Sequence, residues 1–156
     1  MKAVKYLSFF MLTFLFIGCN KMQWSERSAK EMSWNEAANY CEELSEGGYY
    51  NWRLPSIDEL RTIIKNCPAT EADGKCKLSV KNGCLSCWQN CGGCELKKNN
   101  GGYYSKLGDE EVKLWSSSLI HKNSYFVDFG SGQISTDTFR NESGYEITNY
   151  VRCVRK

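Results

Sequence analysis

The sequence has little of what a catalytic centre needs. Its single histidine, His121, lies beside a turn-like run of polar residues, where a lone histidine is more typical of the surface than of a general base. Serines 116–118 lack the glycine elbow of a hydrolase nucleophile. Helix starts and a solvated loop explain the acidic candidates, which are Asp58, Glu59, Asp109, Glu110 and Glu111. We therefore predict no catalytic residues and no cofactor.

The sequence also lacks a long apolar run. The longest, over residues 7–17, has eleven residues, too few for a helix to span a bilayer at about 1.5 Å per residue. Two lysines precede it and a glycine follows, as in an export signal. "FIGC" then ends at Cys19 and resembles the lipobox of bacterial lipoproteins, which implies cleavage of residues 1–18 and a lipid on Cys19. A plain secretory signal and an uncleaved anchor are the alternatives.

Excess charge of one sign is missing as well. The chain is formally +2, and removing residues 1–18 takes away two lysines and no acid, which leaves 18 basic and 18 acidic residues. A neutral mature chain gives no reason to expect nucleic-acid binding. The length is that of one domain, which we place at 33–156, behind a lipidated polar tether over 19–32. Trp24 is the apolar exception in this tether and is expected to pack on the domain or on the membrane.

Cysteine, in contrast, is abundant. Nine cysteines are an odd number, and assigning Cys19 to a lipid leaves eight. Eight can pair completely in an oxidising compartment outside the cytosol. We predict disulfide bonds among Cys41, Cys67, Cys76, Cys84, Cys87, Cys91, Cys94 and Cys153, with Cys67–Cys76 as a plausible local pair.

The densest cysteine stretch is "CLSCWQNCGGC" over 84–94, with two Cys-x-x-Cys pairs three residues apart. Zinc modules usually separate such pairs by about a dozen residues or more, and a thioredoxin-like pair needs a helix start. The stretch belongs to a glycine- and lysine-rich insertion over 66–102 that has little periodicity. We predict that disulfides hold this insertion in shape and that it binds no metal, with a metal site or a redox-active pair as alternatives.

Two helices and several strands are predicted. Ser33 with Glu36, and Ser56 with Glu59, form capping boxes before apolar stripes of helical spacing, and Gly47-Gly48 is expected to stop the first helix. Strands are predicted over 113–120, 125–129 and 149–154, with a glycine turn over 130–132 leading to a strand at "QIST". Tyr125, Val127 and Phe129 should share one face. Helices followed by an antiparallel sheet indicate an α+β domain.

Five motifs are spread along the chain: "W..A..YC..L" from Trp34 to Leu44, "WRLPSIDEL" (52–60), "LWSSS" (114–118), "VDFGSG" (127–132) and "YVRCVRK" (150–156). Together they resemble the Lcl C-terminal-like domain, an exported bacterial family of largely unknown function. The resemblance implies a C-type-lectin-like fold, with two helices beside a twisted antiparallel sheet and termini that meet. Meeting termini fit a Cys41–Cys153 bond.

The resemblance also suggests which ligands to expect. The best-studied namesake is an adhesin that binds sulfated glycosaminoglycans through basic surface, a ligand that the neutral net charge of the mature chain does not favour. C-type lectins that bind sugar through calcium use Glu-Pro-Asn or Gln-Pro-Asp with Trp-Asn-Asp, and none of these occurs here.

Aromatic residues in or beside the loops are the remaining candidates for ligand contact, because their rings offer flat stacking area. They are Trp88, Tyr103, Tyr104, Tyr125 and Tyr145; the alternative is that most pack beneath the long loop. We expect a noncatalytic glycan- or protein-binding protein, lipid-anchored in the cell envelope and facing the periplasm or exterior. A structural envelope subunit, or a metal or redox protein, is the alternative.

Overall fold

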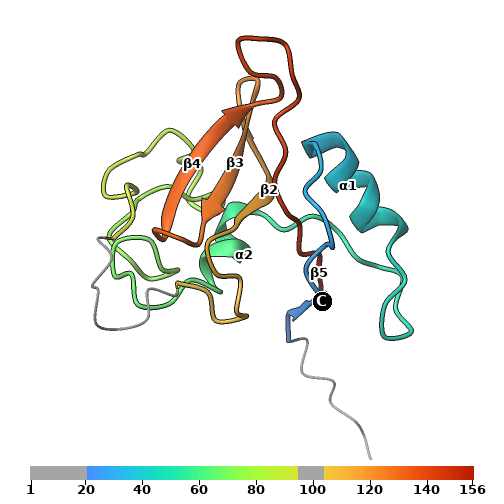
Figure 1. Ribbon diagram of the computed structural model, residues 1–156. Helices are drawn as coiled ribbons and strands as arrows, with labels where there is room; N and C mark the ends of the chain where they lie inside the picture. The colour runs from blue at the N-terminus through green and yellow to red at the C-terminus, as the bar shows by residue number, and fades with distance from the viewer. Residues whose placement is uncertain (1–20, 95–103) are drawn as a thin grey trace, which may run out of the picture.

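A computed structural model describes residues 21–94 and 104–156. The chain forms an α+β domain of two short helices and antiparallel strands, as predicted (Figure 1). The elements are β1 (Gln23–Trp24), α1 (Trp34–Glu43), α2 (Ile57–Arg61), β2 (Lys113–Ile120), β3 (Asn123–Asp128), β4 (Gln133–Thr138) and β5 (Val154–Arg155). Among the described residues, no helix is both long and apolar enough to cross a bilayer.

A three-stranded sheet, β2-β3-β4, forms the centre of the domain. The β3–β4 hairpin pairs Asp128 with Gln133, so the predicted glycine turn is confirmed. Gly132 has φ +68°, and a Cβ there would lie 3.1 Å from the Cys67 side chain. The backbone angle and the close approach both favour glycine.

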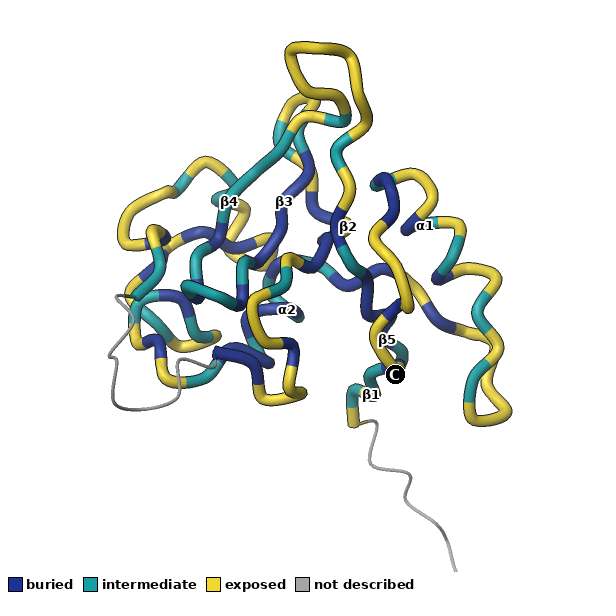
Figure 2. The backbone as a smooth tube through the Cα atoms, in the orientation of Figure 1, coloured by how far each residue is buried: buried dark blue, intermediate teal, exposed yellow. Residues whose placement is uncertain are grey.

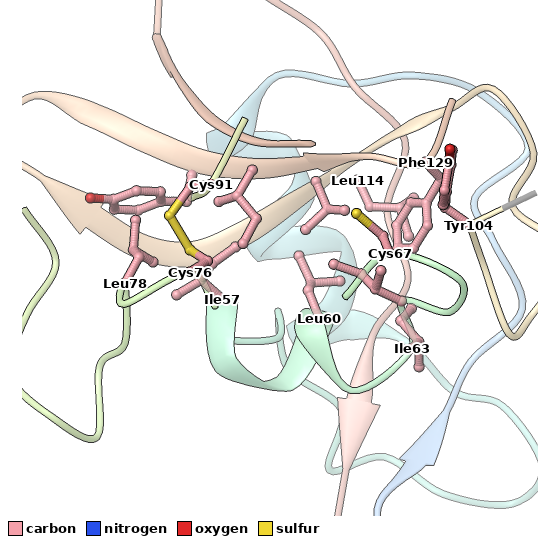
Figure 3. Packing of buried hydrophobic residues seen from close by; sticks show 14 residues of the cluster. Ile57, Leu60, Ile63, Cys67, Cys76, Leu78, Cys91, Tyr104, Leu114 and Phe129 are labelled. Carbon is pink, nitrogen blue, oxygen red and sulfur yellow. A yellow bond between two sulfur atoms is a disulfide. The ribbon is translucent and has the colours of Figure 1, made fainter. Parts of the chain in front are cut away.

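Both faces of this sheet are covered along β3, where residues 124–127 are all buried, whereas most of β4 is half-buried (Figure 2). Side chains alternate between the faces of a strand, and β3 sends large apolar side chains to each. One face packs Tyr125 and Val127, with Phe129 just beyond the strand, against α2 and the cysteine-rich segment (Figure 3). The other packs Phe126, with Trp115 of β2, against α1 and the carboxyl-terminal segment.

The two helices begin where the sequence predicted. Both capping boxes are present, Ser33 with Glu36 and Ser56 with Glu59. The expected stop of α1 at Gly47-Gly48 is wrong: the helix ends at Glu43, because Leu44 is already extended. The two glycines instead form a turn between Glu46 and Tyr49.

The α2 helix is shorter than its apolar stripe. It ends at Arg61, yet the expected buried residues Ile57, Leu60, Ile63 and Ile64 all lie in the core.

The amino-terminal segment belongs to the folded domain. The described part of the expected tether, residues 21–32, lies along the carboxyl-terminal segment. The backbone N–H of Ser25 donates to the Cys153 carbonyl (2.9 Å) and that of Ser28 to the Val151 carbonyl (2.8 Å). Trp24 packs against the core. The predicted last strand over 149–154 is correspondingly reduced to β5, because its earlier residues bond irregularly to residues 25–32 and to β2.

Four disulfides join the eight cysteines of the described residues. Cys41–Cys153 is present, as the family resemblance implied, and the others are Cys67–Cys94, Cys76–Cys91 and Cys84–Cys87. The expected Cys67–Cys76 pair is wrong. Residues 91–94 fold back over the β3–β4 turn, where the Cys94 N–H donates to the Ser131 carbonyl (2.9 Å). This return brings the later cysteines beside the earlier ones.

Arg61 holds the cysteine-rich segment onto α2. Its buried guanidinium donates to four backbone carbonyls, those of Thr70 (3.0 Å), Glu71 (2.7 Å), Cys76 (3.1 Å) and Leu78 (2.7 Å). Burial lowers the pKa of Arg61, an effect that nearby Asp58 and Asp73 oppose. The Arg61 side chain therefore satisfies and fixes backbone carbonyls of this irregular loop, as the N–H groups of a neighbouring strand do in a sheet.

Arg152 joins three further segments. Its Nε lies 2.8–2.9 Å from both carboxylate oxygens of the fully buried Asp109, and Nη1 donates to the Ser25 carbonyl (2.7 Å). Asp109 also accepts from the Ser105 hydroxyl (3.1 Å). The ion pair thus connects the carboxyl-terminal segment to residues 105–109 and to the amino-terminal segment.

Replacing Arg61 by methionine should lower the free energy of unfolding by about 3 kcal/mol, because buried carbonyls lose their donors. Urea unfolding monitored by tryptophan fluorescence measures the change. Arg140→Met is the matched control: that arginine side chain is 64% exposed, and its loss should change stability by less than about 0.5 kcal/mol. Equal effects of the two variants would contradict the role assigned to Arg61.

Removing the Cys41–Cys153 bond by alanine at both positions should cost about 4–5 kcal/mol, because the bond closes a loop of more than 100 residues. Removing Cys84–Cys87 by serine at both positions should cost about 2 kcal/mol, since that loop spans only a few residues. Thermal unfolding without reductant compares the two. The reverse order would contradict this assignment.

Candidate functional site

Trp88 and Tyr125 form a stacked aromatic pair where the cysteine-rich segment meets the sheet. Their ring centroids are 5.3 Å apart and the planes are inclined by 30°. Tyr125 is fully buried on β3, and its hydroxyl donates to the Leu85 carbonyl; Trp88 is 40% exposed. Burial raises the pKa of Tyr125. The arrangement presents part of the Trp88 indole to solvent on a fixed base.

The loop that carries Trp88 is held at several points. The Cys84–Cys87 bond closes the turn directly before Trp88, and Ser79 and Cys84 exchange two backbone hydrogen bonds (2.9 and 3.1 Å). Cys91, which follows closely, is fixed to Cys76. Ser86, Gln89 and Asn90, near Trp88 in the sequence, are exposed, and the Asn90 amide donates to the Lys75 carbonyl (3.4 Å). An aromatic face with amide and hydroxyl groups beside it can stack on a ring and hydrogen bond to its substituents.

The other predicted contact residues lie elsewhere. Tyr104 is 4% exposed, and its hydroxyl donates to the Cys94 carbonyl (3.2 Å), so both Tyr104 and Tyr125 are core residues. Tyr145 is 73% exposed, in the loop between β4 and the carboxyl-terminal segment. Tyr103 and the predicted lipidation residue Cys19 lie outside the described residues. Of the predicted contact residues within 21–94 and 104–156, the structure therefore brings together only Trp88 and Tyr125.

A second aromatic group was missed by the sequence analysis. The Arg155 guanidinium lies 3.1 Å from the Tyr49 ring centroid and 5.6 Å from that of Trp52, and it donates to the Asn51 side chain (3.4 Å). Tyr50 beside them is 75% exposed. The dipeptide Tyr49-Tyr50 after two glycines was the available signal.

A polar depression of about 430 Å³ lies between α2 and the cysteine-rich segment. Asp58, Asp73, Lys77, Lys81 and Asn82 line it. Asp58 is already engaged, since it accepts from the Ser79 hydroxyl (3.1 Å) and the Lys81 N–H (3.0 Å). No group of acidic residues, histidines and cysteines within 21–94 and 104–156 could hold a metal ion. All eight cysteines there are in disulfides, so none offers a thiolate.

The charged residues of "WRLPSIDEL" form a structural ion pair. Arg53 donates to both carboxylate oxygens of Glu59 (2.6 and 2.7 Å), and Glu59 also caps α2 through Ser56. Burial raises the pKa of Glu59, but the hydrogen bonds from Arg53 and Ser56 outweigh it and bring the pKa to about 2. His121 lies in the β2–β3 turn with φ +55°.

The fold and the four disulfides define a small α+β domain that carries the stacked pair Trp88 and Tyr125. The chain matches the Lcl C-terminal domain family over residues 19–155 and belongs to that family. The match begins before Ser33, in agreement with the packing of residues 21–32 on the domain. Neither the curated proteins nor the solved structures include a match to this chain.

Glu59 should make stability depend on pH in acid. Its pKa is about 2 in the folded chain and near 4.5 when free. Its contribution is therefore complete above about pH 4.5 and is lost as the pH falls toward 2. We expect Glu59→Gln to lower stability at pH 7 by about 1 kcal/mol, because Arg53 is half exposed and solvent screens the pair, and to flatten the acid dependence. Urea midpoints between pH 2 and 7 test this, and an unchanged slope would contradict it.

Proposed function

We propose that this protein is a lipid-anchored cell-envelope protein whose C-type-lectin-like domain binds an extracytoplasmic ligand without catalysis. The class of ligand best suited to the domain is a glycan. Cys19 carries the lipid in this proposal, and the loop of Trp88 carries the ligand contact.

Two observations support an exported location. The amino-terminal sequence has the features of an export signal that ends at a lipobox-like cysteine. The eight cysteines at positions 41–153 pair completely, and four disulfides are typical of an oxidising compartment. The paired cysteines and the amino-terminal signal therefore both favour a location outside the cytosol.

The arrangement of the chain supports the lectin-like fold. Two helices lie beside an antiparallel sheet, β1 pairs with β5, and Cys41–Cys153 joins the first helix to the last segment. A long loop stapled by disulfides lies on one face of the sheet. In such a fold the loops supply recognition and the sheet supplies a rigid base.

The observation that carries the binding proposal is the half-exposed Trp88 stacked on the buried Tyr125. A large apolar ring normally packs inward, and here disulfides on both sides hold it at the surface. The indole face suits the apolar side of a sugar ring, while the flanking amides suit its hydroxyl groups. Because Trp88 is already fixed, little side-chain entropy is lost on binding.

A glycan array tests the proposal with the purified mature lipoprotein in detergent. We expect Trp88→Ala to weaken binding of the best glycan by about tenfold or more, while Trp88→Phe retains part of it. Tyr145→Ala is the matched control, since it removes an exposed aromatic ring from a different loop. Unfolding curves of each variant separate a lost contact from a lost fold.

Two results would overturn the assignment. Unchanged binding by Trp88→Ala, with loss in Tyr145→Ala, would move the contact to the 139–147 loop. Absence of any glycan ligand, together with a stoichiometric envelope protein in pull-downs, would establish the structural-subunit alternative in its place.

A further inference from the structure

Both ends of the folded chain lie on one face of the molecule. β1 pairs with β5 in the register Gln23–Arg155 and Trp24–Val154, and Figure 1 shows both beside the carboxyl terminus. Lys21 and Lys156 are exposed there. We call the surface formed by Lys21, Met22, Tyr50, Val80, Lys81 and Lys156 the termini face.

The proposed lipid must lie close to this face. Cys19 is four residues before Gln23, the first residue of β1. A fully extended chain spans at most about 3.5 Å per residue, so the tether reaches no more than about 14 Å. The face around β1 is therefore the part of the domain that an anchor on Cys19 would hold nearest the membrane.

The termini face is continuous beyond the two strands. Met22, Val80, Lys81 and Lys156 line one depression of about 220 Å³, although they come from three separate parts of the sequence. Arg155, next to Lys156, stacks on Tyr49, which places the 75% exposed Tyr50 beside the carboxyl terminus. Val80 is 44% exposed. Exposed lysines, a tyrosine and small apolar groups are the mixture that suits a membrane–water interface.

The lysines of the termini face are available for an outside partner. No ion pair among the described residues includes Lys21, Lys81 or Lys156. Of the carboxylates in the same depression, Glu59 is paired with Arg53 and Asp58 accepts two hydrogen bonds from residues 79–81. Glu26, in the amino-terminal segment, is exposed and lies 4.0 Å from Arg152. Within the described residues, no ion pair therefore offsets the ammonium groups of these three lysines.

We propose that the termini face docks on the anionic headgroups of the membrane that holds the lipid. This inference rests on the proposed lipid at Cys19. Docking fixes the orientation of the domain, because the β2–β3 turn and the 139–147 loop lie at the other end of the sheet (Figure 1). The lipid and the termini face then hold the domain to the membrane at two points, so that the domain does not rotate freely about the lipid.

Amine footprinting of the full-length lipoprotein in vesicles tests the orientation. The vesicles are 70% phosphatidylcholine and 30% phosphatidylglycerol, and pure phosphatidylcholine vesicles and detergent micelles are compared with them. We expect acetylation of Lys21, Lys81 and Lys156 to slow about fivefold in the anionic vesicles. Lys122, exposed in the β2–β3 turn, should react equally in all three and serves as the internal control.

A variant with Lys21→Glu, Lys81→Glu and Lys156→Glu provides the second measurement. Protection of Tyr50 from iodination in anionic vesicles should be lost in this variant and kept in Lys122→Glu, which changes one charge at the other end. These positions are exposed, so neither variant should alter the unfolding midpoint by much.

The outcomes separate the docking surface from the anchor. Equal labelling of all four lysines on a chain whose intact mass includes the lipid would overturn docking and leave the anchor standing. A mass without lipid would overturn both. Equal protection in micelles and in both kinds of vesicle would assign the face to a second protein copy and overturn the proposed lipid partner.

Discussion

Burial of both faces of the β2–β3–β4 sheet is the constraint on which the domain depends. Two short helices cannot cover two faces alone, so irregular segments complete both cores. On one side α2 is extended by the cysteine-rich segment, which is held by Arg61 and by the Cys67–Cys94 and Cys76–Cys91 disulfides. On the other side α1 is extended by both terminal segments, held by Cys41–Cys153. Covalent bonds and buried arginines supply the order that longer helices would otherwise give.

Much of this fold could be predicted from the sequence because short-range patterns determine it. The capping boxes at Ser33 and Ser56, and the alternation along 125–129, each depend on neighbours within a few residues. Apart from the end of α1, which was expected at Gly47-Gly48, the expectations that failed depend on distant residues. The Cys67–Cys94 pairing follows from a return of the chain over the β3–β4 turn, and residues 21–32 are ordered by hydrogen bonds to residues 149–153. Composition alone made that segment look like a linker.

Only part of the candidate site could be predicted from the sequence, again because the rest depends on contacts between distant residues. Aromatic residues could be located in the sequence, but exposure is a property of the packed molecule. Tyr104 and Tyr125 lie in the core, whereas Trp88, which directly follows the Cys84–Cys87 bond, is 40% exposed. The contact of Arg155 with Tyr49 joins residues far apart in the chain. The sequence marks Tyr49-Tyr50 after two glycines, but nothing near either residue in the sequence indicates that Arg155 lies against Tyr49.

The Cys41–Cys153 bond also governs how the domain carries mechanical load. Tension on the amino-terminal segment reaches Cys41, where the covalent path divides: one arm continues along the chain and the other enters through Cys153. A force applied at Trp88 would therefore be carried by two covalent paths in parallel, each bearing a fraction of it. Only the residues before Cys41 carry the force as a single chain and can be pulled straight by it. The length of this segment therefore limits how far the domain extends before the strands of the sheet must slide apart.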